Sequence, residues 1–450
     1  MQRVVAVRPE EVPAVCWCWL YIFAVLSSYY IMRPIRDQMG VAGGVNNLPW
    51  LFSGTLAGMV LLNLPFAYLV KKLPRSRFIP LTYRFFALNI VLFAVALHVA
   101  SAEQAIWVGR IFFIWASVYN LFVVSVFWQL NVDLFSPEQG KRLFGFIAAG
   151  ATIGALVGSA VTASLVRYVS PTLLLIGAAL LLEVAVFSVG RLARLSPSLH
   201  RRLGERSGAK ASDNTSDNAN DKADERPVGG SVIAGITHAF RSPYLLSVGA
   251  FLLLYAVTST FVYFQQADIV SHSFTDRGAQ TAFFASVDLG VNTLALIVQL
   301  FFTGRIILLL GVSLALALLP ALTMLGFAVL ALTPSLGVIA VFQVMRRAAD
   351  YAITRPTREV IYTVVPREDR YKTKGFIDTF VYRLGDQVGA WSVPLLTGVG
   401  PRAAPLVAIA AAAIWLANAL WLGRRQQSLE AAERRDKPSS AATEQPMPAG

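Results

Sequence analysis

The sequence predicts an all-α protein that crosses a lipid bilayer twelve times, in two six-helix halves. Of its 450 residues, 56% are hydrophobic and only 14% are charged, whereas about a quarter of the residues in a soluble domain are charged. Apolar runs long enough to span the hydrocarbon core recur along the whole chain. The sequence lacks the short alternating strands that are typical of a membrane barrel. A long polar stretch divides the apolar runs into two sets of six.

Each predicted span is an apolar run of roughly 20 residues or more, bounded by polar residues or proline. The spans of the first half cover residues 13–32, 48–70, 78–100, 104–131, 143–166 and 170–193. The spans of the second half cover residues 243–268, 279–303, 305–331, 335–355, 374–397 and 404–423.

Basic residues gather in the loops at one end of the predicted bundle. The turns at 71–77 and 366–374 each carry four of them, the loop at 136–142 ends in basic residues, and Arg424 and Arg425 follow the last span. Short loops rich in Lys and Arg stay on the cytoplasmic side, so we expect both termini in the cytoplasm of a bacterial-type inner membrane. This topology also explains the net charge of +13, and we exclude nucleic acid as a partner.

The polar stretch between the halves defines the domains. We expect an N-terminal half at 1–193, a cytoplasmic linker at 194–242, a C-terminal half at 243–423 and a cytoplasmic tail at 424–450. Residues 204–227 contain no Val, Ile, Leu, Phe, Met or Trp, so this part of the linker is predicted to be disordered. Residues 231–240 are predicted to form a short amphipathic helix at the membrane surface.

The two halves contain an internal repeat. Residues 136–147 read SPEQGKRLFGFI and residues 366–377 read PREDRYKTKGFI, 230 positions later, each in the turn between the fourth and fifth span of its half. Repeated six-helix halves are a feature of major facilitator transporters, which bind their substrate near the bilayer midplane between the halves. The sequence therefore predicts the major facilitator fold.

Five charged residues lie inside the tenth and eleventh spans. They are Arg346, Arg347, Asp350, Arg383 and Asp386. A charge at the bilayer centre costs at least ~2.5–3.5 kcal/mol, so such residues face a cavity or a partner. The spacing lets Asp350 pair with either neighbouring arginine, and Asp386 can pair with Arg383 or take up a proton. Arginine suits phosphate and carboxylate, so this cluster either binds an anion or forms a closed ion-pair network.

Other polar residues are candidates for the same cavity. Asp288, Asn292 and Gln299 form one helical stripe, which favours a cavity lining over a lipid face. Arg33 and Arg36, in the loop expected after the first span, either attract an anion or form an outer gate with Asp37 and Asp268. Asn120 and Trp128 are candidates for contact with a base, with an interfacial anchor as the alternative for Trp128.

Further charged residues are candidates for coupling or gating. Glu183 is either a proton site or a neutral acid bonded to a neighbouring helix. Several charged residues lie at the end of the tenth span and around the following turn: Arg355, Arg358, Glu359, Lys374 and Asp378. They either form gating ion pairs, or the arginines simply extend to the membrane interface.

Small residues recur in the fifth span, at Gly150, Gly154 and Gly158. This spacing indicates close helix packing. The sequence holds no phosphate-binding loop, nucleophile elbow or metal ligand set, and Cys16 and Cys18 suggest neither a disulfide nor a metal site. The N-terminal run is too long for a signal peptide. We therefore expect neither an enzyme nor a cofactor.

Residues 351–389 resemble the ATP/ADP translocase family of plastids and obligate intracellular bacteria, within the major facilitator superfamily. Pro-Thr-Arg-Glu at 356–359 is similar to that family's Pro-Thr-Lys-Glu, and Lys-Thr-Lys-Gly at 372–375, followed by Ile-Asp, to its Lys-Val-Lys-Gly. Arg-Leu-Gly at 383–385 is similar to the family's Arg-Leu-Gly, and the stretch at 32–37 is similar to the end of the first helix in bacterial relatives. Asp386 departs from the family by replacing a lysine, which favours a less charged substrate or proton coupling.

The resemblance implies a secondary-active transporter that moves a nucleotide or related organic phosphate by alternating access. We expect the protein to be a monomer in the bilayer. Arg346, Arg347 and Arg383 would bind the anion, while Asp350, Asp386 and Asp288 balance charge or carry protons. Two alternatives stay open. The chain could be a proton-coupled carrier of another small molecule, or a sensor or scaffold that does not transport.

Overall fold

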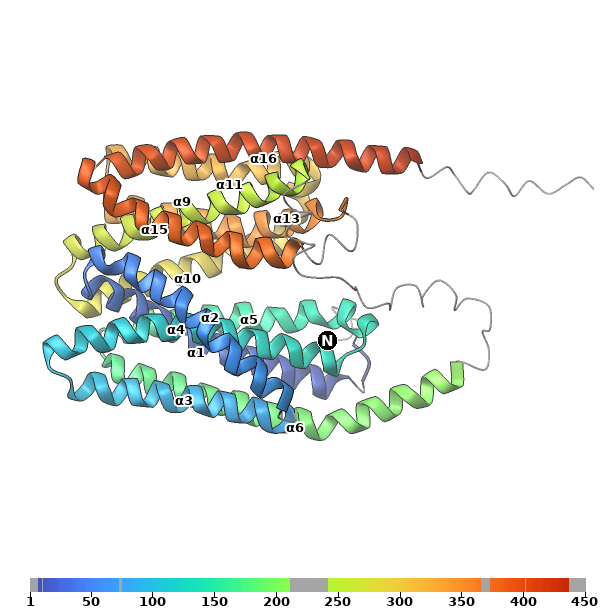
Figure 1. The fold of residues 1–450 in the computed structure, drawn as a ribbon. Coiled ribbons are helices and arrows are strands. Elements are labelled where there is room, and N and C mark those ends of the chain that lie inside the picture. The colour runs from blue at the N-terminus through green and yellow to red at the C-terminus, as the bar shows by residue number, and fades with distance from the viewer. Residues whose placement is uncertain are drawn as a thin grey trace, which may run out of the picture.

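The computed structural model describes residues 7–9, 11–72, 75–210, 242–365, 373–400 and 402–436, and none of these residues forms a strand. Two helical bodies lie one above the other in Figure 1, one from each half of the chain. The first half consists of α1 (Val12–Ala42), the short helix η1 (Val45–Asn47), α2 (Leu48–Lys72), α3 (Arg75–Val99), α4 (Ala102–Leu134), α5 (Pro137–Leu165) and α6 (Pro171–Lys210).

The second half repeats this arrangement, with two interrupted helices. It consists of α9 (Pro243–Ser273), α10 (Arg277–Phe301), α11 (Thr303–Leu332), α12 (Leu336–Ala349), the π-helix η2 (Asp350–Thr354), α13 (Arg355–Ile361), the π-helix η3 (Ile377–Val381), α15 (Tyr382–Val399) and α16 (Ala403–Asp436). In the described residues, ten helices are long and apolar enough to cross a membrane. The segments α12–η2–α13 and η3–α15 occupy the tenth and eleventh predicted spans, so helices lie at all twelve predicted positions.

Helix starts follow from local sequence signals. Ser101 and Ser136 each accept a hydrogen bond from the backbone N–H of a glutamine three residues later, and that glutamine's side chain bonds back to the serine N–H. These reciprocal bonds satisfy two backbone donors that a helix start leaves unpaired.

Three predicted spans end about ten or more residues before the corresponding helices do. Helix α1 continues past residue 32 to Ala42 with Pro34 inside it, so Arg33 and Arg36 lie on a helix rather than in a loop. Helix α6 continues to Lys210 and α16 to Asp436, so the first part of the predicted linker and of the predicted tail is helical. The rest of the linker, including the predicted helix at 231–240, lies outside the described residues, as does most of the second copy of the repeat.

Glycines set the packing within each half. Helix α5 packs on α1 through Gly150, Gly154 and Gly158, and a Cβ at Gly154 would lie 2.5 Å from the carbonyl oxygen of Phe23. In the second half, α15 packs on α9, and a Cβ at Gly389 would lie 2.8 Å from the Cβ of Thr260. The predicted close packing of the fifth span is confirmed, and its neighbour is the first helix.

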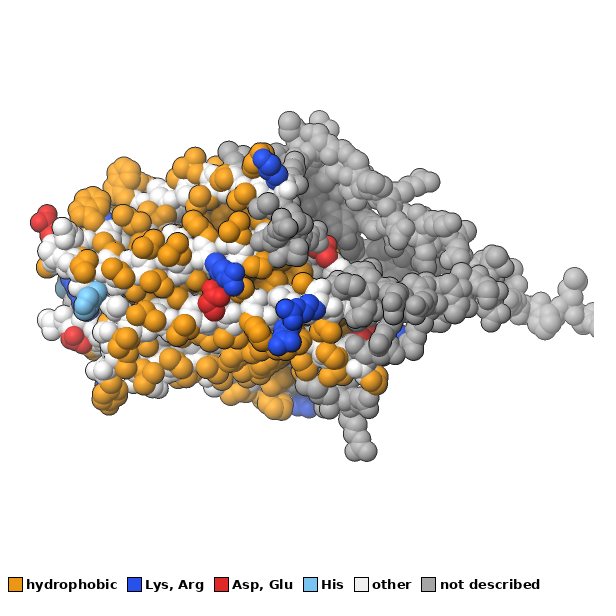
Figure 2. Space-filling model, turned by 90° about the horizontal axis from the view of Figure 1, so that it is seen from below, with side chains coloured by type: hydrophobic (Ala, Val, Ile, Leu, Met, Phe, Trp, Pro, Cys, Tyr) orange, Lys and Arg blue, Asp and Glu red, His pale blue; other side chains and the backbone are white. Residues whose placement is uncertain are grey.

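The outer surface of the bundle is apolar. Figure 2 shows the face formed by α3 and α6, where hydrophobic side chains cover most of the described surface. Large exposed side chains on these two helices include Leu88, Leu92, Leu173, Leu180 and Phe187. An apolar belt of this extent on long helices fits contact with lipid chains.

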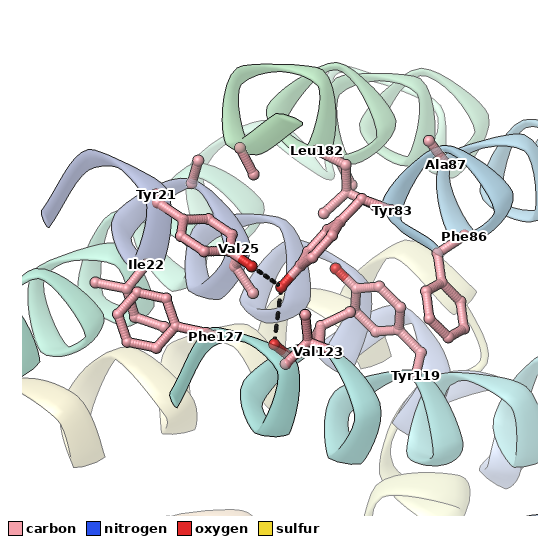
Figure 3. Packing of buried hydrophobic residues seen from close by; sticks show 14 of the residues in the cluster. Tyr21, Ile22, Val25, Tyr83, Phe86, Ala87, Tyr119, Val123, Phe127 and Leu182 are labelled. Atoms are coloured by element: carbon pink, nitrogen blue, oxygen red, sulfur yellow. Dashed lines mark hydrogen bonds between the residues drawn. The ribbon is translucent and has the colours of Figure 1, made fainter. Parts of the chain in front are cut away.

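The core of the first half combines aromatic packing with neutral hydrogen bonds. The hydroxyl of Tyr21 donates to the hydroxyl of Tyr83 over 2.6 Å, and Tyr83 donates to the Val123 carbonyl over 2.8 Å. Figure 3 shows this chain of two bonds among Phe127, Phe86 and other buried side chains. Because both tyrosine hydroxyls find an acceptor, this part of the core buries them without an unpaired donor.

The two halves contact each other toward one end of the bundle. We name the end that holds the N-terminus and the end of α16 the terminal end, and the opposite end the far end (Figure 1). Near the far end, the rings of Trp50 and Trp391 lie 4.8 Å apart, and Trp391 donates to Ser53 over 3.0 Å. Phe52 packs on Tyr263 nearby. Other contacts between the halves include the hydrogen bonds Ser53–Gln387 and Gln38–Gln280 and the ion pair Arg33–Asp288, and these lie between mid-depth and the far end.

Candidate functional site

Two connected cavities lie between the halves. The smaller has a volume of about 250 Å³ and is lined by six arginines and three aspartates. The larger has a volume of about 500 Å³ and is lined mainly by aromatic, amide and small side chains. Arg33, Tyr351 and Arg355 line both. The charged cavity thus continues into a larger and less charged one.

Arg346 is the most deeply buried arginine of the smaller cavity, with 3% of its surface exposed. Its Nε donates to the Thr323 hydroxyl over 3.1 Å, and its Nη2 donates to the hydroxyls of Ser259 and Thr258 over 2.8 and 3.3 Å. In the described part of the chain, no carboxylate lies within ion-pair distance of Arg346. Its charge is therefore stabilised by neutral dipoles and is not cancelled by a counter-charge.

Asp288 joins the two halves. Its Oδ1 accepts from Arg33 of α1 over 3.0 Å and from Arg347 of α12 over 2.7 Å. The second oxygen of Asp288 and the Nη2 of Arg347 are buried and find no hydrogen-bond partner in the described structure. One carboxylate thus serves two arginines, and the group carries one surplus positive charge.

Asp350 pairs with Arg355 over 3.0 Å and accepts from the Tyr255 hydroxyl over 2.9 Å. This corrects the expectation that Asp350 pairs with Arg346 or Arg347. The expectation assumed regular α-helical spacing, whereas a π-helix begins at Asp350 and brings residues five apart close together.

Two further ion pairs line the smaller cavity. Arg383 and Asp386 pair over 3.0 Å, as their spacing predicts, and Asp386 also accepts from Thr260 over 3.4 Å. Arg36 lies 3.4 Å from Asp37, and the Tyr263 hydroxyl of the other half donates to Asp37 over 3.1 Å. The latter bond places Asp37 in the contact between halves, as one of the two sequence-based alternatives expects.

The larger cavity holds the predicted stripe of α10 together with Asn120. Asn292 donates to Ser159 of the first half over 3.3 Å, and Gln299 donates to the Tyr351 carbonyl over 3.2 Å. Asp288, earlier on the same helix, lines the smaller cavity. The prediction that this stripe faces a cavity is confirmed.

Three predicted candidates lie outside both cavities. Trp128 packs against Phe144 within the first half, with ring centroids 5.8 Å apart. Glu183 is exposed on the outer face of α6, where it lies 3.5 Å from Arg84, and Asp268 is exposed beside His272. The structure therefore corrects the expected base contact of Trp128 and the expected gate at Asp268. Of the two alternatives for Glu183, the exposed position argues against a proton site in the cavity, whereas the contact with Arg84 of α3 agrees with bonding to a neighbouring helix.

Four charged residues on either side of the turn that follows α13 form ion pairs with one another, all within the second half. Arg358 lies 3.7 Å from Asp378, and Glu359 pairs with Lys374. None of these four residues lines either cavity. They join α13 to the segment around η3 at the terminal end, so in this conformation they form no gate between the halves.

Sequence reasoning missed one wall of the smaller cavity. Tyr255, Ser259, Tyr263 and Gln266 line it from α9, and Tyr382 lines it from α15. The first four recur at intervals of four, four and three residues, which is a polar stripe at helical period. That stripe was the signal available in the sequence. It was overlooked because hydroxyl and amide groups lower the hydropathy of a span far less than charges do.

The fold and the cavities define a class of protein: a helical membrane protein with two similar halves and a polar site between them. The chain belongs to the Major Facilitator Superfamily, whose model matches residues 15–346. The match ends just before the stretch at 351–389. The protein is therefore a multi-pass membrane transporter of the major facilitator type.

Solved structures support the same fold. The chain is similar to a bacterial homolog of the human lysosomal transporter Spinster in an inward-facing and unoccupied conformation, with 12% identity, a TM-score of 0.58 and coverage of 94% of this chain and 99% of the other. It is similar to a POT family transporter in complex with thioalcohol conjugated peptide, with 12% identity, a TM-score of 0.59 and coverage of 92% and 96%. At these identities the likeness shows the fold alone. No curated protein matches the sequence.

Proposed function

We propose that this transporter moves a nucleotide or a related organic phosphate by alternating access. The observation that carries the proposal is Arg346, a buried arginine without a carboxylate partner in the described structure, at the wall of a cavity with six arginines. A buried charge of this kind is costly unless an opposite charge reaches it. An anionic substrate supplies that charge.

The two cavities suit the two parts of such a substrate. Guanidinium groups bind phosphate oxygens in pairs, and Arg346, Arg347 and Arg383 line the smaller cavity. Tyr30 and Asn292 line the larger cavity next to it. Aromatic and amide groups stack on and hydrogen-bond to a planar polar ring. We place the phosphate in the smaller cavity and the organic part in the larger one.

The similarity of residues 351–389 to ATP/ADP translocases supports a nucleotide as the organic phosphate. The basic loops favour a cytoplasmic location for both termini and for the terminal end. Because contacts such as Ser53–Gln387 and Trp50–Trp391 join the halves toward the far end, we propose that this conformation exchanges substrate with the cytoplasm of a bacterial cell.

Substrate binding would act on the contact between the halves. Asp288 holds both Arg33 and Arg347 through one oxygen. A phosphate that binds these arginines competes with Asp288 for them, which weakens the link between α1 and α10. Only an interaction that differs between two states shifts their populations, and this competition is such an interaction.

A second candidate function is a proton-coupled carrier of another small molecule. It is favoured by Asp386, a buried acid beside Arg383 at the position where the translocases carry lysine. In that case a proton gradient drives uptake, and Asp386→Asn removes the dependence on the gradient. Uptake that needs no gradient and keeps its rate in Asp386→Asn would exclude this mechanism.

A thermal-shift screen of the purified protein tests the proposed function. A ligand that binds only the folded state raises the apparent stability by mass action. We expect nucleotides or other organic phosphates to stabilise the wild type, Arg383→Ala to lose this effect, and Arg402→Ala, in an exposed turn, to keep it. Stabilisation only by uncharged compounds would overturn the assigned substrate class.

A further inference from the structure

The charged groups of the site can be counted. Six arginines line the smaller cavity together with Asp37, Asp288 and Asp386, and Asp350 lies directly behind it, paired with Arg355. The charged residues of the larger cavity, Arg33 and Arg355, are already in this count. Six arginines and four aspartates leave two positive charges in the described site.

The pairing shows where the two charges lie. Three arginines each have an aspartate of their own: Arg36, Arg355 and Arg383. Arg33 and Arg347 share Asp288, and Arg346 has only hydroxyl and carbonyl partners. One surplus charge therefore belongs to Arg346, and the other to the Arg33–Asp288–Arg347 group.

These two positions are adjacent. Arg346 and Arg347 are consecutive residues of α12, and both line the smaller cavity. The Nη2 of Arg347 is buried without a hydrogen-bond partner in the described structure. The described hydrogen bonds of Arg346 use its Nε and Nη2, and none uses its Nη1. Both arginines therefore line the same cavity, and each has a donor that no described residue accepts.

We infer that the site is matched to a substrate with two negative charges, and that its substrate class is a phosphate monoester rather than a nucleoside di- or triphosphate. A phosphate monoester carries about −1.5 to −2 charges at pH 7. A di- or triphosphate brings additional negative charge for which the site holds no free cation, and unpaired charge in a low-dielectric site is costly. The inference rests on the proposed function and narrows it.

Binding measurements on the purified full-length protein test the inference. The probes are AMP, ADP and ATP without divalent cations, and the methyl ester of AMP, which has one negative charge. We expect AMP to bind most tightly, with ATP and the methyl ester at least ~10-fold weaker, because each charge mismatch leaves a charge unpaired near the arginines. ATP or ADP binding as tightly as AMP, or the methyl ester doing so, would overturn the inference.

A variant with one aspartate fewer is expected to change which nucleotide binds most tightly. Asp386→Asn raises the surplus of the site from two to three, so we expect its preference to shift from AMP toward ADP. The matched control is Asp268→Asn, at an exposed position outside both cavities, which should keep the wild-type order. An unchanged order in folded Asp386→Asn would contradict the charge count. If that variant does not fold, the relative affinities of the wild type for AMP, ADP, ATP and the methyl ester still test the inference.

The outcomes separate the two proposals. If none of the phosphates binds, the proposed function fails, and this inference fails with it. If they bind and ATP is preferred, the function stands and the inference alone is wrong.

Discussion

The two halves share a helix arrangement but differ in what lies inside them. In the first half, the interior around α1, α3 and α4 is aromatic and neutral, with Tyr21, Tyr83 and the Val123 carbonyl joined by hydrogen bonds (Figure 3). In the second half, α12, α15 and their neighbours carry charged residues toward the centre. Of the ten charged residues of the site, the second half supplies seven and the first half three, Arg33, Arg36 and Asp37.

This difference shows that a repeated fold does not require a repeated site. The glycine-mediated packing of the first helix on the fifth recurs in both halves, at Gly154 and at Gly389. The charges of the site do not recur in the same way, since seven of the ten come from the second half. We therefore expect substitutions in the second half to change binding, and substitutions in the first half to change mainly stability.

Asp288→Asn should have the largest effect, because it acts on both halves at once. It leaves Arg33 and Arg347 facing each other without their shared carboxylate. Removing one partner of a buried ion pair costs about 3–5 kcal/mol, so we expect a clear loss of thermal stability, part of which added AMP restores. Stability equal to that of the exposed control Asp268→Asn would contradict the assigned role of Asp288.

Arg346→Gln tests the second half alone. The glutamine keeps a donor toward Ser259 or Thr323 but removes the unpaired charge. Losing a buried charge contact costs about 2–5 kcal/mol, so we expect phosphate binding to weaken by about 100-fold or more while the protein stays folded. Calorimetric titration measures this. Binding that weakens less than threefold in the variant would show that the anion lies elsewhere.

The sequence predicted the positions of all twelve helices but not their full lengths. Hydropathy detects only the lipid-buried part of a helix, so the polar extension of α6 to Lys210 and of α16 to Asp436 was missed. Arg33 and Arg36 were assigned to a loop because charge and Pro34 interrupt the apolar run. They are tolerated in α1 because they reach aspartates in the cavity.

The sequence indicated many of the charged residues that line the cavities, but it indicated few of their ion-pair partners. Spacing along one helix predicted the Arg383–Asp386 pair, which the structure confirms. Asp288 pairs with Arg33, which lies on α1 in the other half. The spacing of residues along one helix does not predict a contact between two halves. The pairing of Asp350 depends on a π-helix, which has no reliable sequence signal.

Glycine substitutions in α5 test the structural role of the first half. A Cβ at Gly154 would lie 2.5 Å from the Phe23 carbonyl oxygen, whereas a Cβ at Gly145 would meet nothing within 4 Å. We expect Gly154→Ala to lower the free energy of unfolding by ~1–3 kcal/mol through overpacking. The matched variant Gly145→Ala should be neutral or slightly stabilising. Equal effects in thermal unfolding would argue against close packing of α1 on α5.

The smallest effect is expected at Glu11, which precedes α1 at the terminal end. Burial alone raises the pKa of its carboxyl, but hydrogen bonds from the Arg8 N–H, Gln139 and Arg142, with the charge of Arg142, outweigh burial and lower the pKa. A lowered pKa stabilises the fold above the unfolded-state pKa, and this contribution is lost as the pH falls through the folded-state pKa.

Thermal unfolding of wild type and Glu11→Gln across pH measures this contribution. We expect the variant to be less stable at pH 7, with the difference shrinking as the pH falls below about 4.5. A difference that stays constant from pH 7 to the acid range would show that the charge of Glu11 does not contribute.

The most direct test of the account is uptake of labelled AMP and labelled adenosine into proteoliposomes that contain the wild type or Arg346→Gln. The two compounds differ only in the phosphate group, and Arg346 is the arginine assigned to that group. The account predicts saturable uptake of AMP by the wild type, little uptake of adenosine, and loss of AMP uptake in the variant. Uptake of adenosine in preference to AMP, or AMP uptake that Arg346→Gln leaves unchanged, would contradict it.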